Sequence, residues 1–298
     1  TLDIPSTVTW IKGGDLNWSA GSSYGWDYTT YVNNKGGAFY GTSISGLNIA
    51  EGNKKLRIGA SAFESCVNLE KVTLPNRVTK IDEGAFKSDS GLTTVSFAEG
   101  NNAVVIGKNA FNGCSNLDSI SWGKGISEIG HGAFGGTAVE SVTFPDTVKT
   151  IGESSFAQCK FLTTITLNEG LKTIGRAAFK GCSMLEGTIV IPSTVEEIQG
   201  GDLNWSAGSS YGWDYTTDVN NKGGAFYGTG IEELVIKKST VNVTIGASAF
   251  ENCKNLKKVT LANRCTDIGE GAFYGDAALA DLTMSDSENQ LAIGKNAF

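Results

Sequence analysis

Histidine is almost missing from this sequence, and its scarcity excludes several kinds of active site. The single histidine is His131, so no metal site built on two histidines, such as H-E-x-x-H, can form. A Ser-His-Asp or Cys-His site would have to use this one ring. No C-x-x-C pair occurs, which argues against zinc. The sequence therefore predicts a protein that is not an enzyme and holds no metal or cofactor.

An excess of positive charge and long apolar runs are also lacking. Lys and Arg number 24 against 31 Asp and Glu, so the net charge is −7. A nucleic-acid binder needs a cationic surface to displace counterions, and electrostatic docking on an anionic membrane needs one too. No apolar run approaches the roughly 18 residues of a spanning helix. We therefore expect no nucleic-acid partner and no membrane insertion by this segment.

Proline is scarce, with 4 residues against 39 glycines, and what fills the chain instead is a repeat. A small residue followed by Phe recurs with gaps of about 23 residues, one of them doubled by an insertion. Such a period indicates a solenoid in which one unit is one turn. The repeated phenylalanines are Phe39, Phe63, Phe86, Phe111, Phe134, Phe156, Phe179, Phe226, Phe250, Phe273 and Phe298.

Each unit has the same internal order. A run of the form L-x-x-V-x-L, such as Leu69, Val72 and Leu74, alternates at its end as a half-buried strand does. A turn position follows, where all four prolines stand, and then V-x-x-I. The Gly after that Ile, replaced by Asp82 in one unit, suggests a corner with positive φ. We interpret the following Ala-Phe segment as a single helical or 3₁₀ turn.

The units 58–80 (IGASAFESCVNLEKVTLPNRVTK) and 151–173 (IGESSFAQCKFLTTITLNEGLKT) resemble the BspA-like leucine-rich repeats of bacterial surface antigens. The expected fold is α/β: a right-handed leucine-rich-repeat solenoid with a parallel β-sheet face, about eleven turns of about 23 residues and two aromatic-rich insertions. Residues 1–298 are expected to form one domain. The resemblance implies an extracellular or cell-surface location, adhesion to host proteins or glycans, and no catalysis.

The sequence also has a second, longer repeat that contains several of the short units. Residues 1–111 match residues 188–298, so equivalent positions differ by 187 in their numbering. Residues 12–39 and 199–226 agree at 26 of 28 positions, whereas 40–57 and 227–244 agree at 6 of 18. The near-identical part contains an insertion, about one repeat unit long, that enters before Ala-Phe. The two insertions span about 13–37 and 200–224. Loops inserted into a rigid solenoid often carry recognition.

The insertions are rich in aromatic residues spaced for one face of a strand, which suggests an aromatic β-hairpin suited to sugar rings or a protein partner. The rings could equally pack the loop onto the solenoid. Asp15 begins a segment like a calcium loop, but Ala20 stands where that loop requires Gly. The predicted binding residues are Trp18, Tyr24, Trp26, Tyr28, Trp205, Tyr211, Trp213 and Tyr215.

Five cysteines stand three residues after a repeat Phe, where other units have Thr or Asp. This column predicts buried free thiols. Cys159 and Cys182 lie in successive units and could approach the distance of a disulfide, but a stacked column does not usually offer the geometry of a bridge. Cys265 falls outside the column. Residues equivalent to His131 include Lys108, Glu153 and Arg176, a variety typical of a solvated surface position.

We expect a monomeric, non-enzymatic surface or secreted binding protein that recognises a host or matrix protein, or a glycan. The first apolar run of each unit is expected to form a strand, and the polar positions of these strands together form a face rich in Thr and Ser. This face could bind an extended partner or simply be solvated. Two alternatives are a carbohydrate-binding module acting through the insertions and a structural stalk. The chain begins at Thr1 without a signal peptide, and neither end has a polar cap. We therefore expect the natural chain to continue in at least one direction.

Overall fold

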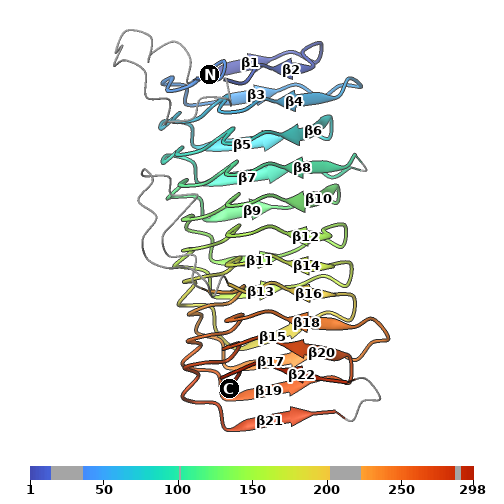
Figure 1. The fold of residues 1–298 in the computed structure, drawn as a ribbon. Coiled ribbons are helices and arrows are strands. Elements are labelled where there is room, and N and C mark those ends of the chain that lie inside the picture. The colour runs from blue at the N-terminus through green and yellow to red at the C-terminus, as the bar shows by residue number, and fades with distance from the viewer. Residues whose placement is uncertain (15–35, 101, 202–222, 286–289) are drawn as a thin grey trace, which may run out of the picture.

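The fold is a stack of short parallel strands, two from each turn of the chain (Figure 1). The computed structural model describes residues 1–14, 36–100, 102–201, 223–285 and 290–298. Odd-numbered strands come from the L-x-x-V-x-L runs and even-numbered strands from the V-x-x-I segments. The odd strands are β1 (Leu2–Ile4), β3 (Leu47–Ile49), β5 (Lys71–Leu74), β7 (Thr94–Phe97), β9 (Ser119–Ser121), β11 (Ser141–Thr143), β13 (Thr164–Thr166), β15 (Thr188–Ile191), β17 (Glu233–Ile236), β19 (Lys258–Leu261) and β21 (Asp281–Met284).

The even strands form the longer sheet, which has eleven strands in the order β2 to β22. The odd strands divide into sheets of five, two and four strands. The prediction of strands along one side was therefore incomplete, because V-x-x-I also pairs in register between turns. The even strands are β2 (Trp10–Ile11), β4 (Leu56–Ile58), β6 (Val78–Ile81), β8 (Val104–Ile106), β10 (Ile126–Ile129), β12 (Thr150–Ile151), β14 (Thr173–Ile174), β16 (Glu197–Ile198), β18 (Val243–Ile245), β20 (Cys265–Ile268) and β22 (Ala292–Ile293).

A ladder of stacked phenylalanine rings forms the third side of the stack. From Phe39 to Phe298, the centroids of successive ladder rings lie 5.1–5.7 Å apart, and their planes are nearly parallel. The buried Val, Leu and Ile of both strand rows pack against these rings. Because one turn cannot bury its own apolar face, this shared core holds the turns together.

The Ala-Phe segment is not a helical turn, and the described residues contain no helix, so the α/β label was wrong. Ser61 and Ser65, on either side of Phe63, have positive φ values of 52° and 64°. This conformation directs the N–H of Phe63 to the carbonyl of Ala85 in the next turn, at 2.7 Å. Hydrogen bonds between turns thus replace the bonds within a helix.

The glycine after the Ile serves a different purpose from the one predicted. It is not a positive-φ corner; a Cβ built on Gly152 would lie 2.5 Å from the carbonyl oxygen of Ile129 in the preceding turn. Asp82 is tolerated because glycines, Gly59 and Gly107, occupy the same place in both neighbouring turns. The glycines therefore permit close approach of successive backbones.

Two buried arginines, missed at the sequence level, join turns along the corners. Arg77 donates to the carbonyls of Pro5 and Val8 in one turn and of Ala50 in the next, at 2.6–3.0 Å. Arg264, its counterpart in the second half of the chain, makes the equivalent bonds.

The carbonyl of each of the four prolines accepts a hydrogen bond from the N–H of the residue three positions later, which confirms the predicted turn position. The number of turns and their handedness stay predictions.

Candidate binding surfaces

The two insertions enter turns that keep the backbone hydrogen bond of a turn without an insertion. In a plain turn, the N–H of Ala85 donates to the carbonyl of Asp82 at 3.3 Å. Across the first insertion, Ala38 makes the same bond to Lys12 at 3.0 Å, and across the second, Ala225 bonds to Gln199 at 3.1 Å. Each insertion therefore leaves and re-enters the stack at one point. The eight predicted aromatic residues lie outside the described residues, so their role stays a prediction.

The phenylalanine ladder continues beneath both insertion points. Phe39 stacks on Phe63 at 5.2 Å, and Phe179 stacks on Phe226 at 5.1 Å. Seven such steps separate Phe39 from Phe226, which places the two insertion points roughly 37 Å apart along the stack. Both insertions therefore start from the same side of one supporting scaffold.

Tyrosines directly follow three of the ladder phenylalanines, a feature not singled out from the sequence, and two of them, Tyr40 and Tyr227, stand just after the insertions. Tyr40 is 42% exposed and Tyr274 is 56% exposed. Tyr227 is half-buried; its hydroxyl accepts from the amide of Asn252 at 3.1 Å, and Lys180 lies over its ring at 5.7 Å. Their common place after the ladder Phe was the signal available in the sequence.

The odd strands present a polar outer face, as predicted. Strand β5 shows the alternation, with Lys71 and Thr73 exposed and Val72 and Leu74 buried. Four successive strands in the middle carry only hydroxyl side chains at their outward positions. These are Thr94 and Ser96 on β7, Ser119 and Ser121 on β9, Ser141 and Thr143 on β11, and Thr164 and Thr166 on β13.

Charged pairs replace the hydroxyls towards the C-terminal end of this face. Lys257 contacts Glu232 at 2.7 Å, and Lys258 contacts Glu233 at 2.9 Å. The pKa of Glu233 is lowered chiefly by its hydrogen bond to Lys258. These cross-strand pairs are exposed and add little to stability. The uncharged hydroxyl stretch and the charged stretch thus offer different chemistry on one face.

The cysteine column is buried and its thiols are free, as predicted. The thiol of Cys114 donates to the carbonyl of Phe86 at 3.0 Å, and other members bond the preceding ladder Phe in the same way. Burial raises the pKa of Cys253 to about 12. Cys265, which lies outside this column, is the first residue of β20, where it takes the buried position that Val has in V-x-x-I. These thiols are structural.

Asp89 and Asp276 stand in the same column, at equivalent positions of the two halves. One carboxylate oxygen of Asp89 accepts the N–H of Cys66 at 2.7 Å, and Asp276 does the same with Cys253. Neither Oδ2 atom has a hydrogen-bond partner. Burial raises the pKa of each carboxyl to about 8. Both groups are therefore largely protonated at neutral pH.

His131 is not the solvated side chain that its variable column suggested. It is half-buried in a row of charged residues, where its Nδ1 lies 3.9 Å from Glu153. Arg176 binds the same carboxylate at 3.0 Å. Burial lowers the pKa of His131. The attraction of Glu153 raises the pKa but offsets only part of this effect, so the pKa lies below its usual value. The ring is held by packing and by neighbouring charges.

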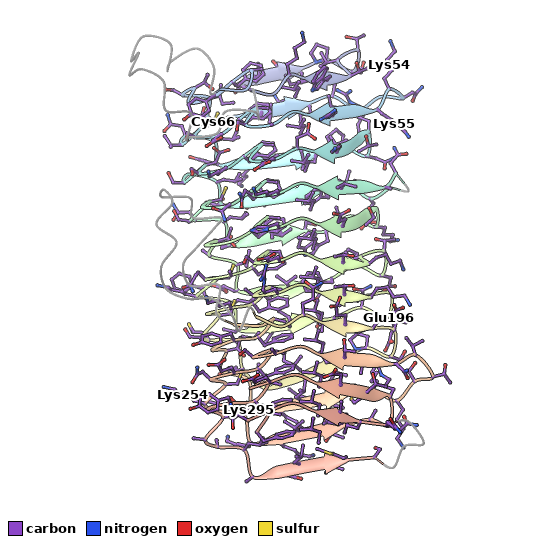
Figure 2. All side chains as sticks on the ribbon, in the orientation of Figure 1. Lys54, Lys55, Cys66, Glu196, Lys254 and Lys295 are labelled. Carbon is purple, nitrogen blue, oxygen red and sulfur yellow. The ribbon has the colours of Figure 1, made fainter. Side chains whose placement is uncertain are left out.

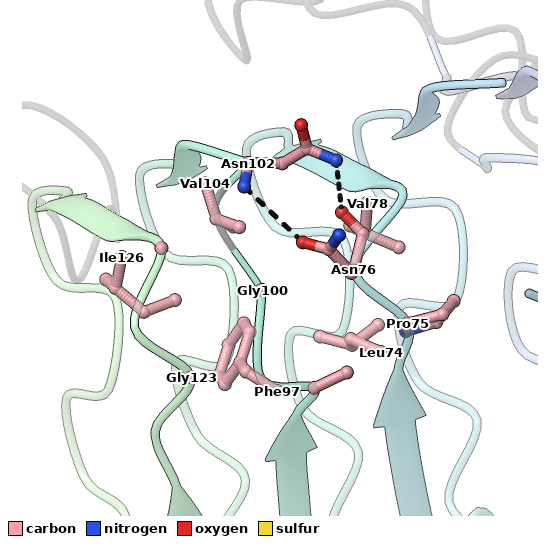
Figure 3. A pocket seen from close by; sticks show the side chains of 12 residues that line it. Leu74, Pro75, Asn76, Val78, Phe97, Gly100, Asn102, Val104, Gly123 and Ile126 are labelled. Atoms are coloured by element: carbon pink, nitrogen blue, oxygen red, sulfur yellow. Dashed lines mark hydrogen bonds between the residues drawn. The ribbon is translucent and has the colours of Figure 1, made fainter. Parts of the chain in front are cut away.

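A small enclosed hollow lies at the corners of β5 to β10, between the two strand rows (Figure 3). Its free volume is about 10 Å³, the space of a single water molecule. The amide of Asn102 donates to the carbonyl of Asn76 at 2.9 Å across it.

Among the described residues, no group of three or more His, Cys, Asp or Glu side chains could hold a metal ion. None of the described segments forms a helix fit to span a bilayer.

Stacked strands, a shared phenylalanine ladder and polar outer faces define the class: a leucine-rich-repeat solenoid. Residues 32–160, 96–204 and 221–298 match the BspA type leucine rich repeat region, in six copies. The chain therefore belongs to the BspA-type leucine-rich-repeat family. The curated proteins include no match to it.

Solved structures of bacterial repeat proteins are similar to this chain. A leucine-rich repeat protein from Bacteroides ovatus shares 24% identity, with a TM-score of 0.46, over 81% of this chain and 67% of its own. One from Eubacterium ventriosum shares 20% identity, with a TM-score of 0.40, over 86% and 82%. A leucine rich cell surface protein from Faecalibacterium prausnitzii shares 18% identity, with a TM-score of 0.36, over 74% and 80%.

Proposed function

We propose that this chain is a non-enzymatic binding protein, secreted or displayed at a cell surface, that recognises a host or matrix protein or a glycan. The proposal rests on membership of the BspA-type repeat family and on one structural observation. Both insertions leave turns that stay closed by the ordinary turn hydrogen bond. Such loops can vary or bind without disturbing the core that supports them.

The binding residues in this proposal are the insertion aromatics. Trp and Tyr offer broad apolar area together with a polar group, which suits sugar rings and hot spots of protein interfaces. Two copies that start from one side of the scaffold would raise avidity for a ligand that reaches both, roughly 37 Å apart. The proposed residues are Trp18, Tyr24, Trp26, Tyr28, Trp205, Tyr211, Trp213 and Tyr215.

The test is binding of the intact chain to immobilised matrix proteins and a panel of glycans. The comparison is a variant with Trp18→Ala, Trp26→Ala, Trp205→Ala and Trp213→Ala, with its fold checked by circular dichroism and thermal unfolding. We expect the folded variant to lose at least tenfold in affinity. A variant restricted to Trp18→Ala and Trp26→Ala should retain the second insertion and lose mainly avidity.

Unchanged binding in the folded fourfold variant would remove the insertions from the site and leave the strand faces. Absence of any saturable ligand across both panels would support a structural stalk instead. Turnover of any ligand that depends on a named side chain would overturn the non-enzymatic assignment.

A further inference from the structure

The outer face of the eleven-stranded sheet carries a compact basic patch at one end. The basic patch consists of Trp10, Lys12, Lys55, Arg57 and Lys80, all exposed to solvent. Trp10 pairs with Arg57 between β2 and β4, and Arg57 pairs with Lys80 between β4 and β6. The three side chains therefore stand side by side on adjacent strands. Lys55, labelled in Figure 2, lies at the corner that leads into β4.

The patch combines a flat ring with fixed positive charge. Trp10 is 51% exposed, and the guanidinium of Arg57 lies 5.6 Å from its ring centroid. The side chains of Arg57 and Lys80 are about half exposed. One buried carboxylate, Asp82, contacts both Arg57 at 2.5 Å and Lys80 at 3.5 Å. Among the described residues, Asp82 is the only carboxylate that forms an ion pair with the four cations of the patch, so the patch keeps unpaired positive charge on a molecule whose net charge is −7.

The second half of the chain provides a natural comparison on the same backbone. At its equivalent positions, Glu197, Thr244 and Asp267 take the places of Trp10, Arg57 and Lys80. They pair in the same way across β16, β18 and β20, and they too are exposed. The strand geometry is thus repeated while the outward chemistry changes from basic and aromatic to acidic. The basic patch is consequently not a requirement of the fold.

We propose that the basic patch binds an acidic polysaccharide, one whose sugar rings carry sulfate or carboxylate groups. An indole ring can stack on the apolar face of a sugar, and neighbouring Arg and Lys can bind its anionic groups through charge-assisted hydrogen bonds. The strands that carry these cations lie about 4.8 Å apart, a spacing at which one or two sugar units span several strands. The proposal deepens the binding role above and rests on it.

The extent of the patch favours a glycan over other polyanions. In the next strands of the same sheet, Val105 and Glu128 continue the outward column, so the positive surface ends after three strands. Nucleic acids gain affinity from many phosphate contacts in a row, and membranes from a broad cationic face. A short anionic sugar segment matches a patch of this size, because each sugar unit brings both a ring face and a charge.

The experiment measures binding of three hexasaccharides to the intact chain by calorimetry: a sulfated glycosaminoglycan, its desulfated but carboxylated form, and neutral maltohexaose. A single-stranded oligonucleotide and anionic lipid vesicles serve as competing polyanions. We expect binding of one or both acidic sugars, no binding of maltohexaose, and a loss of affinity of about tenfold between low and physiological salt. The sulfated and carboxylated probes distinguish the two sources of negative charge.

The matched variant carries the residues of the second half: Trp10→Glu, Arg57→Thr and Lys80→Asp. It should keep its thermal stability and lose at least tenfold in affinity for the acidic sugar. Adding Glu197→Trp, Thr244→Arg and Asp267→Lys to that variant should restore binding at the other end of the sheet. The substitution Asp82→Gly should tighten binding, since glycine fills this column in neighbouring turns and the competing carboxylate is removed.

The proposal fails if the folded matched variant binds the acidic sugar as tightly as the unchanged chain. It also fails if maltohexaose binds equally, or if the oligonucleotide or the vesicles bind more tightly than every sugar. These failures differ from failure of the proposed function, because the insertion tryptophans are intact in all these variants. A chain that binds matrix proteins through its insertions but no acidic sugar would overturn only this inference.

Discussion

Cys66, Asp89 and Cys114 occupy the same place in three successive turns, yet they differ in what burial does to them. The thiols donate weakly to a ladder carbonyl and stay neutral. Burial of the Asp89 carboxyl, which has one oxygen without a partner, disfavours its charged form and raises its pKa; the nearby Glu64 adds to this effect, and the hydrogen bond from the N–H of Cys66 opposes it. The residue type, within one column, therefore decides whether stability depends on pH.

The substitution Asp89→Asn should stabilise the protein at alkaline pH. The pKa of Asp89 is about 8 in the folded state and near 4 in an unfolded chain, so the unfolded state binds fewer protons between these values. The contribution of Asp89 to the free energy of unfolding consequently falls as pH rises from about 4 to about 8. Asn does not ionise, and its amide keeps an acceptor for the N–H of Cys66.

We expect Asp89→Asn to raise the free energy of unfolding by about 1–3 kcal/mol at pH 8 relative to the unchanged chain, and by much less near pH 5. Urea unfolding at pH 5, 6, 7 and 8 measures the difference. Asp276→Asn, in the equivalent place, is the matched control and should show the same trend. An offset that does not vary with pH would contradict the assignment.

At the scale of elements, the strands are too short to be stable alone. Strands of two to four residues, such as β12 and β5, persist because both neighbouring turns hydrogen-bond to them. The phenylalanine ladder supplies the matching apolar contact on the third side. Each element therefore depends on its neighbours in the stack, as expected of a nearly one-dimensional repeat.

Removing one ring from the middle of the ladder should therefore be costly. Phe134 is fully buried, stacks on Phe111 and Phe156, and meets the edge of Trp122. We expect Phe134→Ala to lower the free energy of unfolding by about 3–5 kcal/mol. Chemical denaturation of the purified variant is the measurement.

Phe298→Ala provides the comparison, because Phe298 stacks on a single ladder ring and is 44% exposed. Its loss should cost about 1 kcal/mol or less. Equal losses for Phe134→Ala and Phe298→Ala would show that position in the ladder does not govern stability.

At the scale of the whole molecule, the two halves share one backbone plan but differ on their outer faces. Arg77 and Arg264 make the same three-turn contacts, whereas Trp10 and Glu197 differ completely in chemistry. The even sheet runs without a break through both halves. Different surfaces can thus be carried by one scaffold at defined separations.

Deleting the insertions should leave the scaffold intact. Removal of residues 14–36 and 201–223 restores the plain spacing between Ile and Phe, and the closing bonds of Ala38 and Ala225 are already present. We expect the double deletion to fold with a melting temperature within a few degrees of the unchanged chain. Circular dichroism and calorimetry test this; failure to fold would mean that the insertions support the stack.

Much of this architecture could be predicted because, in a periodic sequence, equivalent positions occupy the same place in successive turns. The spacing of the phenylalanines, the alternation near Leu74 and the cysteine column all describe which side chains face inward. The second sheet, the absence of a helix at Ala-Phe among the described residues and the true use of the glycines could not be predicted this way. They depend on hydrogen bonds and close approach between turns, which are distant in sequence.

The sequence by itself determined the repeat, the family, the buried columns and the place of the insertions, because hydrophobic burial at a fixed period leaves a direct trace in residue order. Only the tertiary structure decided which outward residues of different turns pair across the second sheet. Trp10, Arg57 and Lys80 come from three separate turns and form one patch because parallel pairing aligns them. Register between strands is a property of the stack, and no single turn encodes it.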